Sequence, residues 1–486
     1  MILKELLRGV RILYTEVELT KEIKGIASDS RNVEQGYAFV AIKGNKRDGN
    51  DYIIQALNKG ACVIITDEEK YKKETNTVIV SNARSTLSIL WSNYYKNPSD
   101  GMKIVAITGT NGKTSTATYI YNILKEAEIK RGLISTTQCL INDKRIEIPE
   151  GTEVADMHSA MTTPDPKILH YLFKRMREEN VEIVVMEASS HALSQNRLEG
   201  VDIEIGIFTN FSEEHLDYHG SMDEYFSAKE LLIKKAKMCI INDDDTKGRL
   251  LLKKYREKSY GVSATDTKDF TISNIKNAEN GLNYDAGWND ERASIKLHQI
   301  GNFNAYNSMM AYACARLLDI DISHIKKGLF KTEKIAGRLE QYKERKIFID
   351  YAHTPRAMEC VIRTVREIIP QNRLIVLFGC GGERDKSKRS KMAEISSMLA
   401  DFTIITSDNP RGENPIEIIK EIVKGVANEF AVISNRREAI RYAAWIMKEG
   451  DILLLLGKGH EEYEITKEGK RYFSERKILD EIYGAE

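Results

Sequence analysis

The sequence predicts an α/β protein of three domains: a small N-terminal α/β domain, a central domain with a mainly parallel sheet of the P-loop type, and a C-terminal Rossmann-like α/β domain. Three observations support this fold class. The chain has 486 residues, whereas a single domain usually takes about 100–200. Short β-branched runs alternate with helix-forming segments along the chain, which is typical of α/β folds. One such run, near residue 105, passes directly into a glycine-rich loop and then a helix.

The N-terminal domain is expected over residues 1–100. Its predicted strands alternate with helical stretches such as residues 52–59, and a segment with Pro and Gly at 98–101 marks its end. The strands are expected at residues 38–42, 61–66 and 77–80.

The central domain is expected over residues 101–335 and the C-terminal domain over residues 336–486. Both contain apolar runs of strand length followed by helix-forming sequence, as in a doubly wound sheet whose strands are buried on both faces. The pattern restarts near Gly337, which sets the second boundary. The central strands are expected at residues 103–107, 182–186 and 203–209, and the C-terminal strands at 347–350, 374–378, 402–406 and 452–456.

Charge and composition exclude several classes of protein. Lys and Arg total 72 and Asp and Glu total 72, so the net charge is zero and no overall field attracts nucleic acid or an anionic membrane. The longest apolar runs are far shorter than the ~20 residues that cross a bilayer. Residues 1–8 interleave charge with leucine and lack the apolar centre of a secretory signal. We therefore expect a cytoplasmic protein without membrane or nucleic-acid partners, whose six scattered cysteines are reduced and mostly in the core.

The glycine-rich loop has the residue types that bind nucleotide phosphates. Backbone N–H groups at a helix start can surround a phosphate, Lys113 can neutralise the β- and γ-oxygens, and the Thr114 hydroxyl can reach Mg²⁺. The strict motif has glycine where this chain has Ile107, and a glycine-rich turn before an ordinary helix is the alternative interpretation. We expect ATP to bind at Gly109, Thr110, Asn111, Gly112, Lys113, Thr114 and Ser115.

The loop sequence T-G-T-N-G-K-T-S resembles the ATP loop of the Mur ligase family, the ATP-dependent enzymes that add amino acids to the peptidoglycan precursor. The resemblance extends over nearly the whole chain, because further motifs follow in a collinear set. These motifs are T-T-P at 162–164, E-A-S-S-H at 187–191, T-N-F at 209–211, H-L-D-Y-H-G at 215–220, A-K at 228–229, G-N-F-N at 301–304, G-R-L-E at 337–340 and D-Y-A-H-T-P at 350–355.

A magnesium site is expected beside the phosphate loop. Glu187 ends a β-branched strand, where open α/β sheets place active groups, and a carboxylate suits Mg²⁺. His215 lies in a short polar loop. The resemblance implies that Glu187 and His215 bind the metal with Thr114, and that Lys229 is carbamylated so that its carboxylate does the same. Lys113 and Lys229 are the residues expected to be catalytic.

The remaining ATP contacts are expected from two later segments. Asn304 and Asn307 are three apart on a predicted helix, so they face the same way and can offer amide groups to an adenine edge. The resemblance implies that both contact ATP, as do Arg338 and Asp350, the latter near the ribose. Because Arg338 and Asp350 come from the third domain, ATP is expected between the central and C-terminal domains, and domain closure completes the site.

The resemblance also implies where the nucleotide-sugar substrate binds. The segment S-D-S-R at 28–31 is similar to the one that holds the uridine diphosphate end, and later positions match contacts to the muramoyl dipeptide. The expected contacts are Ser28, Ser30, Thr162, Thr163, Ser189, Gln195 and Arg197.

The D-N-P-R sequence at 408–411 indicates which amino acid is added. Similar enzymes that add meso-diaminopimelate share it, whereas lysine-adding relatives lack the arginine. Diaminopimelate differs from lysine by a distal carboxylate, which a guanidinium can bind through paired charge-assisted hydrogen bonds. The residues expected to bind the amino acid are Arg389, Asp408, Asn409, Pro410, Arg411, Gly457 and Glu461.

Together these features imply an ADP-forming ligase of cell-wall synthesis. It is expected to join meso-diaminopimelate to the D-glutamate of UDP-N-acetylmuramoyl-L-alanyl-D-glutamate through an acyl phosphate, with ATP as substrate and Mg²⁺ as cofactor, and to be a monomer. One alternative is a related ligase that adds L-lysine or another amino acid or extends folate. A second, from a different class, is a P-loop kinase or nucleotide switch.

Overall fold

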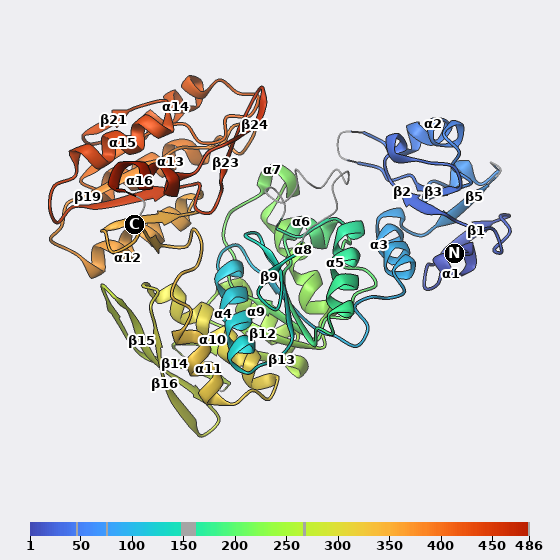
Figure 1. Ribbon diagram of the computed structural model, residues 1–486, viewed down its shortest axis with the longest axis horizontal. Coiled ribbons are helices and arrows are strands. Elements are labelled where there is room, and N and C mark those ends of the chain that lie inside the picture. The colour runs from blue at the N-terminus through green and yellow to red at the C-terminus, as the bar shows by residue number, and fades with distance from the viewer. Residues whose placement is uncertain (45–46, 74–75, 147–161, 266–268, 485–486) are drawn as a thin grey trace.

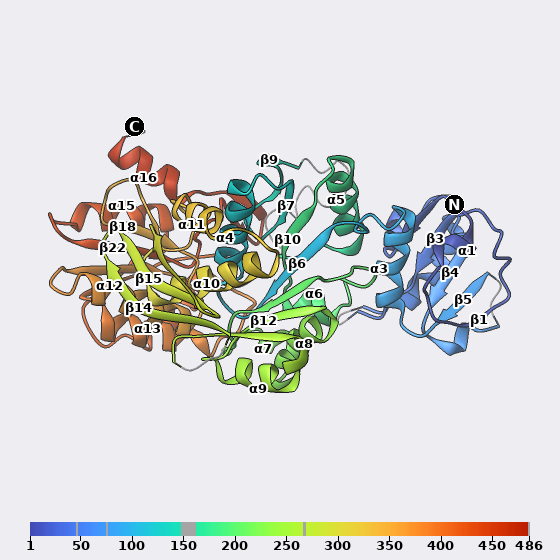
Figure 2. The same cartoon turned by 90° about the horizontal axis from the view of Figure 1, so that it is seen from below.

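The computed structural model describes residues 1–44, 47–73, 76–146, 162–265 and 269–484 (Figure 1). The N-terminal part lies at one end of an elongated molecule, next to the central part, and the C-terminal part lies beyond it (Figure 2). Among the described residues, no helix is both long and apolar enough to cross a membrane.

The N-terminal part is a sheet of order β1-β5-β4-β3-β2, in which β1 alone is antiparallel to its neighbour. The central strand β4 has the sequence V-I-I-T and is buried on both faces, as expected for a parallel strand covered by helices. The strands are β1 (Ile12–Thr15), β2 (Gly25–Ala27), β3 (Tyr37–Val40), β4 (Val63–Thr66) and β5 (Thr77–Val80), and the helices are α1 (Leu3–Leu6), α2 (Ile53–Asn58) and α3 (Ala83–Tyr94).

The central part is a mixed sheet of order β16-β15-β14-β13-β12-β11-β6-β10-β7-β8-β9. Its middle, from β14 to β7, is parallel, and each end is an antiparallel extension. The strands are β6 (Lys103–Thr108), β7 (Arg131–Ile134), β8 (Cys139–Ile141), β9 (Lys144–Arg145), β10 (Ile183–Glu187), β11 (Ile205–Phe208), β12 (Met238–Asn242), β13 (Ser259–Ser263), β14 (Phe270–Ala278), β15 (Gly281–Trp288) and β16 (Glu291–Leu297). The helices are α4 (Lys113–Glu126), α5 (Pro166–Glu178), α6 (Ser190–Ser194), α7 (Leu216–His219), α8 (Met222–Lys235), α9 (Thr246–Lys254), α10 (Asn302–Leu317) and α11 (Ile322–Phe330).

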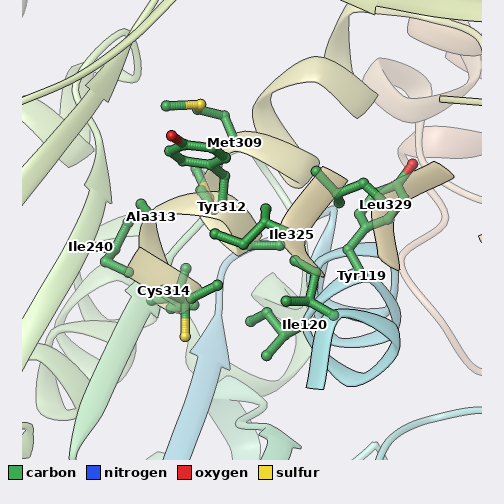
Figure 3. Close-up of a cluster of buried hydrophobic side chains, with 14 of the residues drawn as sticks. Tyr119, Ile120, Ile240, Met309, Tyr312, Ala313, Cys314, Ile325 and Leu329 are labelled. Atoms are coloured by element: carbon green, nitrogen blue, oxygen red, sulfur yellow. The ribbon is translucent and has the colours of Figure 1, made fainter. Parts of the chain in front are cut away.

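A buried cluster fixes helix α4 against α10 and α11 (Figure 3). Tyr119 and Ile120 of α4 contribute to it, and α10 is buried along most of its length because it packs against both the sheet and α4. Close packing of this kind holds backbone positions firmly. It therefore sets where the first turn of α4 and the first turns of α10 lie relative to each other.

The C-terminal part is a sheet of order β17-β18-β22-β19-β20-β21, parallel except for β17, with a separate hairpin β23-β24. Its strands are β17 (Glu340–Gln341), β18 (Ile347–Asp350), β19 (Leu374–Phe378), β20 (Phe402–Ile405), β21 (Phe430–Val432), β22 (Ile452–Leu456), β23 (Tyr463–Thr466) and β24 (Gly469–Tyr472). Its helices are α12 (Pro355–Ile368), α13 (Lys388–Leu399), α14 (Pro415–Val423), α15 (Arg436–Ile446) and α16 (Glu475–Tyr483).

Helix α3 docks the N-terminal part onto the central part. Arg177 of α5 donates hydrogen bonds to the carbonyl oxygens of Lys96, Asn97 and Tyr95 at 2.8, 3.2 and 3.2 Å, just beyond the last turn of α3. A cation is favourable at a helix C-terminus, and these carbonyls have no partner within the helix. Farther along the same helix, the Ser88 hydroxyl lies 2.8 Å from the carbonyl oxygen of Arg197.

The predicted fold class is confirmed. The predicted boundaries near residues 100 and 335 fall between elements of different sheets and remain predictions. The antiparallel strands β14 to β16 and the hairpin β23-β24 were not anticipated.

Candidate active site

The phosphate loop closes tightly on the segment that directly follows β11. Gly109 has φ +142°, and a Cβ there would lie 1.9 Å from Thr209 Oγ1. Gly112 has φ +87°, and a Cβ would lie 2.3 Å from Asn307 Oδ1. Asn210 accepts two hydrogen bonds from the loop, both at 2.9 Å. Its side-chain Oδ1 accepts from the N–H of Asn111, and its backbone carbonyl accepts from the N–H of Thr110. Two glycines are therefore required, and T-N-F at 209–211 braces the loop.

Lys113 begins helix α4 and folds back over the loop. Its Nζ donates to the carbonyl oxygens of Gly109 and Thr110, both at 2.9 Å. Burial lowers the pKa of Lys113, although Glu214 and Glu187 oppose the shift. The amine therefore lies over the glycine-rich loop, and its contact with a phosphate remains a prediction. Thr114 and Ser115 follow in the first turn of the helix and are buried.

Lys229 on α8 lies next to the same loop. Its side chain is only 1% exposed, and its Nζ donates to the carbonyl oxygen of Gly109 at 2.8 Å. Burial, strengthened by the charge of Lys113, holds the pKa of Lys229 well below its ordinary value. Because its pKa is lowered, a larger fraction of a buried amine than of an exposed lysine is in the uncharged, nucleophilic form.

Glu187 ends β10 and is fully buried. Its carboxylate accepts hydrogen bonds from the N–H and the hydroxyl of Thr136, both at 2.9 Å. A carboxylate offers about four lone-pair sites, so two of them remain for a cation. Glu187 therefore suits a hard cation such as Mg²⁺.

His215 is the N-cap of α7 with φ +57°, and its Nε2 lies 3.6 Å from Glu214 Oε2. Burial lowers the pKa of His215 to about 3, so the neutral, ligating form of the ring is favoured. Within the described ranges, no three His, Cys, Asp or Glu side chains are grouped to hold a metal. Of the predicted metal ligands, only Glu187 and His215 are of these four residue types, and the others are Thr114 and a modified Lys229. Metal binding by this set therefore remains a prediction.

Glu214 is a site residue that sequence reasoning missed. Its carboxylate accepts a hydrogen bond from Nε2 of His353, in the C-terminal part, at 3.0 Å. Burial raises the pKa of Glu214, but His215, His353 and Lys113 outweigh this effect and hold it well below its ordinary value. The H-L-D-Y-H pattern begins at His215, the residue after Glu214, and therefore indicated His215 alone. A single glutamate in a polar loop does not by itself indicate a functional site.

The residues predicted to bind ATP come together from two parts of the chain. Asn304 and Asn307 are buried on α10, with Asn307 Oδ1 facing Gly112. Arg338 Nη2 donates to the Thr114 hydroxyl at 3.1 Å, across the junction of the central and C-terminal parts. The structure thus brings a guanidinium of the third part onto the phosphate loop.

Asp350 ends β18, where burial raises the pKa of its carboxyl group. Its two carboxylate oxygens accept hydrogen bonds from the N–H groups of Leu339 and Ala352 at 2.6 and 2.7 Å. These bonds fix the segment that carries Arg338.

Four of the residues predicted to bind the nucleotide-sugar peptide form one cluster. Arg197 donates to the carbonyl of Thr163 at 2.7 Å and to Gln195 Oε1 at 2.7 Å. The Thr163 hydroxyl accepts from the N–H of Ser189 at 3.0 Å and donates to the carbonyl of Glu187 at 2.9 Å. The cluster is therefore joined directly to the end of β10.

The other three lie outside that bonded cluster. Thr162 is half-buried beside Thr163. Ser28 is exposed after β2, and Ser30 is buried with its hydroxyl donating to Gln55 Oε1 at 2.7 Å. Both serines belong to the N-terminal part.

The D-N-P-R segment follows β20 and is held by the hairpin β23-β24. Arg411 has φ +53°, and its N–H donates to the carbonyl of Ile465 at 3.0 Å. Asn409 Oδ1 accepts from the N–H of Ile465 at 2.9 Å and from the buried amine of Lys458 at 3.0 Å. Asn409 Nδ2 in turn donates to Glu461 Oε2 at 2.9 Å.

Gly457, another predicted residue, lies against Asp408, which begins the same segment and is followed in it by Pro410. Gly457 has φ +108°, and a Cβ there would lie 3.0 Å from Asp408 Oδ2. Lys458 and Arg436 outweigh the effect of burial and lower the pKa of Asp408. The structure thus brings the β20 and β22 ends together.

Arg411 and Arg384 form a pair of neighbouring cations. Arg411 Nη1 donates to the carbonyls of Gly382 and Asn409 at 2.9 and 3.3 Å. Burial, and then the charge of Arg384, lower the pKa of Arg411. Two adjacent guanidinium groups of this kind favour an anionic ligand. Arg384 was not predicted from the sequence, because the loop that contains it carries four charged residues of which none stands out.

The prediction for Arg389 needs revision. Its side chain is 1% exposed, and Nη1 forms ion pairs with Glu413 at 3.0 Å and Glu421 at 2.7 Å. The same contacts hold the pKa of Glu413 at about 2. Arg389 is therefore already neutralised and supports the loop, so direct contact with an amino acid is not favoured.

Comparison with known proteins shows what the chain is similar to. Three family models match it in turn: "Mur ligase family, catalytic domain" over residues 22–93, "Mur ligase middle domain" over 107–315 and "Mur ligase, glutamate ligase domain" over 337–459. The UDP-N-acetylmuramoyl-L-alanyl-D-glutamate–2,6-diaminopimelate ligase of Clostridium perfringens is 40% identical over 495 residues, covering 99% of each chain. The enzyme of that name from Caldanaerobacter subterraneus is 38% identical, covering 95% of each chain.

Solved structures give the same result at lower identity. The structure of a UDP-N-acetylmuramoyl-L-alanyl-D-glutamate–2,6-diaminopimelate ligase has a TM-score of 0.69 and 27% identity, with 100% of both chains covered. A folylpolyglutamate synthase from Thermotoga maritima has a TM-score of 0.60 and 18% identity, covering 77% of this chain and 89% of the other. The second likeness shows the fold alone.

Proposed function

The chain belongs to the Mur ligase family, and we propose that it is the ATP-dependent ligase that adds meso-2,6-diaminopimelate to UDP-N-acetylmuramoyl-L-alanyl-D-glutamate in peptidoglycan precursor synthesis. The observation that carries this proposal is the full-length identity of 40% to a ligase of that name. The D-N-P-R segment, with Arg384 next to Arg411, supports the choice of amino acid.

The reaction joins a carboxylate to an amine at the expense of ATP. The γ-phosphoryl group passes to the D-glutamate carboxylate and gives an acyl phosphate and ADP. The diaminopimelate amine then attacks the acyl carbon, and the tetrahedral intermediate collapses with loss of phosphate and a proton. Lys113 and Arg338 both lie at the phosphate loop, where they neutralise charge on the transferred group.

A divalent cation fits the same place by its chemistry. Thr114, Glu187, His215 and a carbamylated Lys229 would hold it, and when bound it would neutralise phosphate charge. Lys113 and Lys229 both contact the carbonyl of Gly109. Two ammonium groups at one oxygen repel each other, so conversion of one of them to an anion relieves the repulsion.

Carbamylation of Lys229 follows from its surroundings. An uncharged amine attacks the carbon of CO₂ with its lone pair and releases a proton to solvent, which leaves a carbamate anion on Nζ. Burial lowers the pKa of Lys229 and so favours the uncharged amine. The carbamate then lies next to Lys113, which stabilises its charge.

Recognition of diaminopimelate depends on protein cations that need an anionic partner, which the side chain of lysine does not provide. The distal end carries a carboxylate, which would be paired with Arg411 and Arg384. L-lysine would leave these cations without a partner in a closed site, and sites built for a polar group reject analogues lacking it by ~10⁴–10⁵. Asp408 and Glu461 provide negative charge near the same loop, where they suit the distal ammonium group.

We also propose a monomer that acts in the cytoplasm on small molecules. The zero net charge supports the absence of a nucleic-acid partner.

The test is ADP release with UDP-N-acetylmuramoyl-L-alanyl-D-glutamate and a panel of amino acids. Release should require both the nucleotide dipeptide and meso-diaminopimelate, with L-lysine far less effective. Equal turnover of L-lysine would contradict the substrate assignment. ADP release that needs no amine would favour a kinase or a nucleotide switch, and activity on folate with glutamate would favour the folate-extending relatives.

A further inference from the structure

The first turn of α16 touches both the segment that carries Arg338 and the loop that carries Glu461. Glu475 and Arg476 are adjacent in this turn, and their side chains have different partners. None of the expected binding or catalytic residues belongs to this turn.

Glu475 fixes the base of the helix to the sheet. It forms a buried ion pair with Arg436, with the Nε and Nη2 of Arg436 at 2.9 and 2.8 Å from Glu475 Oε1. Arg436 also donates to the carbonyls of Ser407 at 3.3 Å and Leu456 at 2.8 Å, at the ends of β20 and β22. Because both side chains are at most 2% exposed, water cannot readily replace these contacts.

Arg476 extends from this fixed base to two segments at once. Its Nε donates to Glu340 Oε1 at 2.9 Å, and its Nη2 also bonds Glu340. Its Nη1 donates to the carbonyl of Gly459 at 3.3 Å. Glu340 Oε2 accepts in turn from the N–H of Gly337 at 2.8 Å. One guanidinium therefore joins the G-R-L-E segment to the loop at 457–461.

The two segments also touch backbone to backbone. A Cβ at Gly337 would lie 2.3 Å from the N atom of His460 and 2.6 Å from the carbonyl carbon of Gly459. Gly459 has φ +56°, and a Cβ at this position would clash with Tyr351. The N–H of Tyr351 donates to the Gly337 carbonyl at 2.9 Å. The segments cannot move independently by much, because no side chain separates them to absorb a shift.

From this arrangement we infer that Arg476 is a positioning residue that couples nucleotide binding at Arg338 to amino-acid binding at the loop 457–461. This inference rests on the proposed function. A nucleotide that orders Arg338 also orders its neighbours Gly337 and Glu340. Arg476 transmits that order to Gly459, so the amino acid binds a loop that is already arranged. Two ligands that order the same element increase each other's affinity.

The experiment measures this coupling directly. Meso-diaminopimelate is titrated by calorimetry into the full-length enzyme with its UDP-linked dipeptide, once without nucleotide and once with a non-hydrolysable ATP analogue. The ratio of the two dissociation constants should be about 5-fold or more in the wild type. In Arg476→Ala the ratio should fall to within about 2-fold of unity, because the link between Glu340 and Gly459 is lost.

Further variants separate coupling from general stability. Arg476→Lys should also lose the coupling, since an ammonium cannot bond both oxygens of Glu340 and the Gly459 carbonyl in one fixed geometry. Glu340→Gln should reduce it, and the double variant should be no worse than Arg476→Ala alone. Arg437→Ala is the matched control, because Arg437 of α15 pairs with Glu481 of α16 at 2.6 Å on the surface. It should keep the wild-type ratio.

Two results would overturn the inference: a wild-type ratio of unity, or a wild-type ratio retained in Arg476→Ala and Arg476→Lys. If Arg476→Ala does not fold, Arg476→Lys and Glu340→Gln decide. Ligation by the wild type is measured in parallel. If the wild type does not ligate meso-diaminopimelate, the proposed function fails, whereas ligation with unchanged coupling in the variants defeats the inference alone.

Discussion

Nη2 of Arg338 donates a hydrogen bond to Oγ1 of Thr114 at 3.1 Å. The bond joins residues 224 positions apart, one in the first turn of the phosphate-loop helix and one before the C-terminal sheet. His353 and Glu214 make a second contact across the same junction, at 3.0 Å. The C-terminal part thus contributes side chains directly to the place where we propose that phosphate is transferred.

Replacing Lys113 by Ala should abolish ligation and leave the fold intact. The variant removes a charge at the phosphate loop, and loss of one such stabilising group usually lowers kcat by about 10²–10³. Lys113 bonds only carbonyls of its own loop, so little packing is lost. ADP release and the melting temperature are measured together. Lys125→Ala, at the exposed end of the same helix, is the control and should keep full activity.

Replacing Lys229 by Ala should lower activity by at least about 10²-fold, with partial recovery when a short carboxylate is added. The physical reason is that the carbamate supplies a negative group that alanine lacks. Labelled bicarbonate should give a carbamate carbon signal by NMR in the wild type and none in the variant. Lys234→Ala, on the exposed face of α8, is the control. A wild-type enzyme without the signal, together with an active alanine variant, would rule out the modification.

Replacing Arg411 by Ala should reduce kcat/KM for meso-diaminopimelate by about 10²-fold or more and leave the poor activity with L-lysine little changed. Arg411→Lys should not recover activity, because an ammonium lacks the planar two-point contact. Arg384→Ala should act in the same direction. Arg363→Ala, an exposed arginine on α12, is the control. An unchanged preference in Arg411→Ala would show that another group reads the distal carboxylate.

Replacing Arg389 by Ala should act on stability instead of selectivity. The variant loses ion pairs to two partly exposed carboxylates, Glu413 and Glu421, and hydrogen bonds of this charged kind each contribute about 1.5–3 kcal/mol. Urea unfolding should therefore shift to lower denaturant, with the preference for diaminopimelate over lysine retained in the folded fraction. A stable variant that loses this preference would restore Arg389 as a direct contact.

Acid should weaken the docking of α3 on α5 at His170, whose Nε2 on α5 lies 3.4 Å from the Ser88 hydroxyl of α3. Burial lowers the pKa of His170 to about 3, so the unfolded chain binds more protons than the folded one between about pH 6.5 and 3. Stability therefore falls as the pH drops through this window, by roughly 2 kcal/mol at pH 5 from this group. The urea midpoint of His170→Gln should fall less between pH 7 and 5 than that of the wild type. The exposed His298→Gln should behave as the wild type.

Local apolar patterns in the sequence predicted many of the parallel strands, but not β2, β7, β12, β13 and β21. Runs such as I-L-L-L-L at 452–456 are apolar at every position, which fits a strand buried on both faces, and β22 has these bounds. The antiparallel strands β14 to β16 were missed, although two-residue connections join them and β16 alternates strictly over most of its length, because the burial pattern in β14 and β15 does not alternate regularly. The hairpin β23-β24 has four exposed residues in its second strand and gave no hydrophobic signal.

Candidate site residues could be named where a motif fixes backbone geometry. The phosphate loop needs glycine at two positions of positive φ, and that requirement is visible in the sequence. Glu214 and Arg384 could not be found in this way, because each acquires its role from a residue more than 25 positions away. Arg389 was misjudged for the opposite reason, since only the folded chain shows that Glu413 and Glu421 already neutralise it.

The docking of α3 fixes the distance between the two parts of the molecule that we propose to bind the ends of the acceptor substrate. Arg177 and Ser88 tie the N-terminal part to α5 and to the segment that carries Arg197. On the proposed assignment, the uridine end binds near Ser30 and the reacting carboxylate lies at the phosphate loop, so the distance between the two ends is set by the protein. A nucleotide with one amino acid fewer or more would present its carboxylate short of, or beyond, the point of transfer. The enzyme thereby selects the length of the peptide before it reads the incoming amino acid.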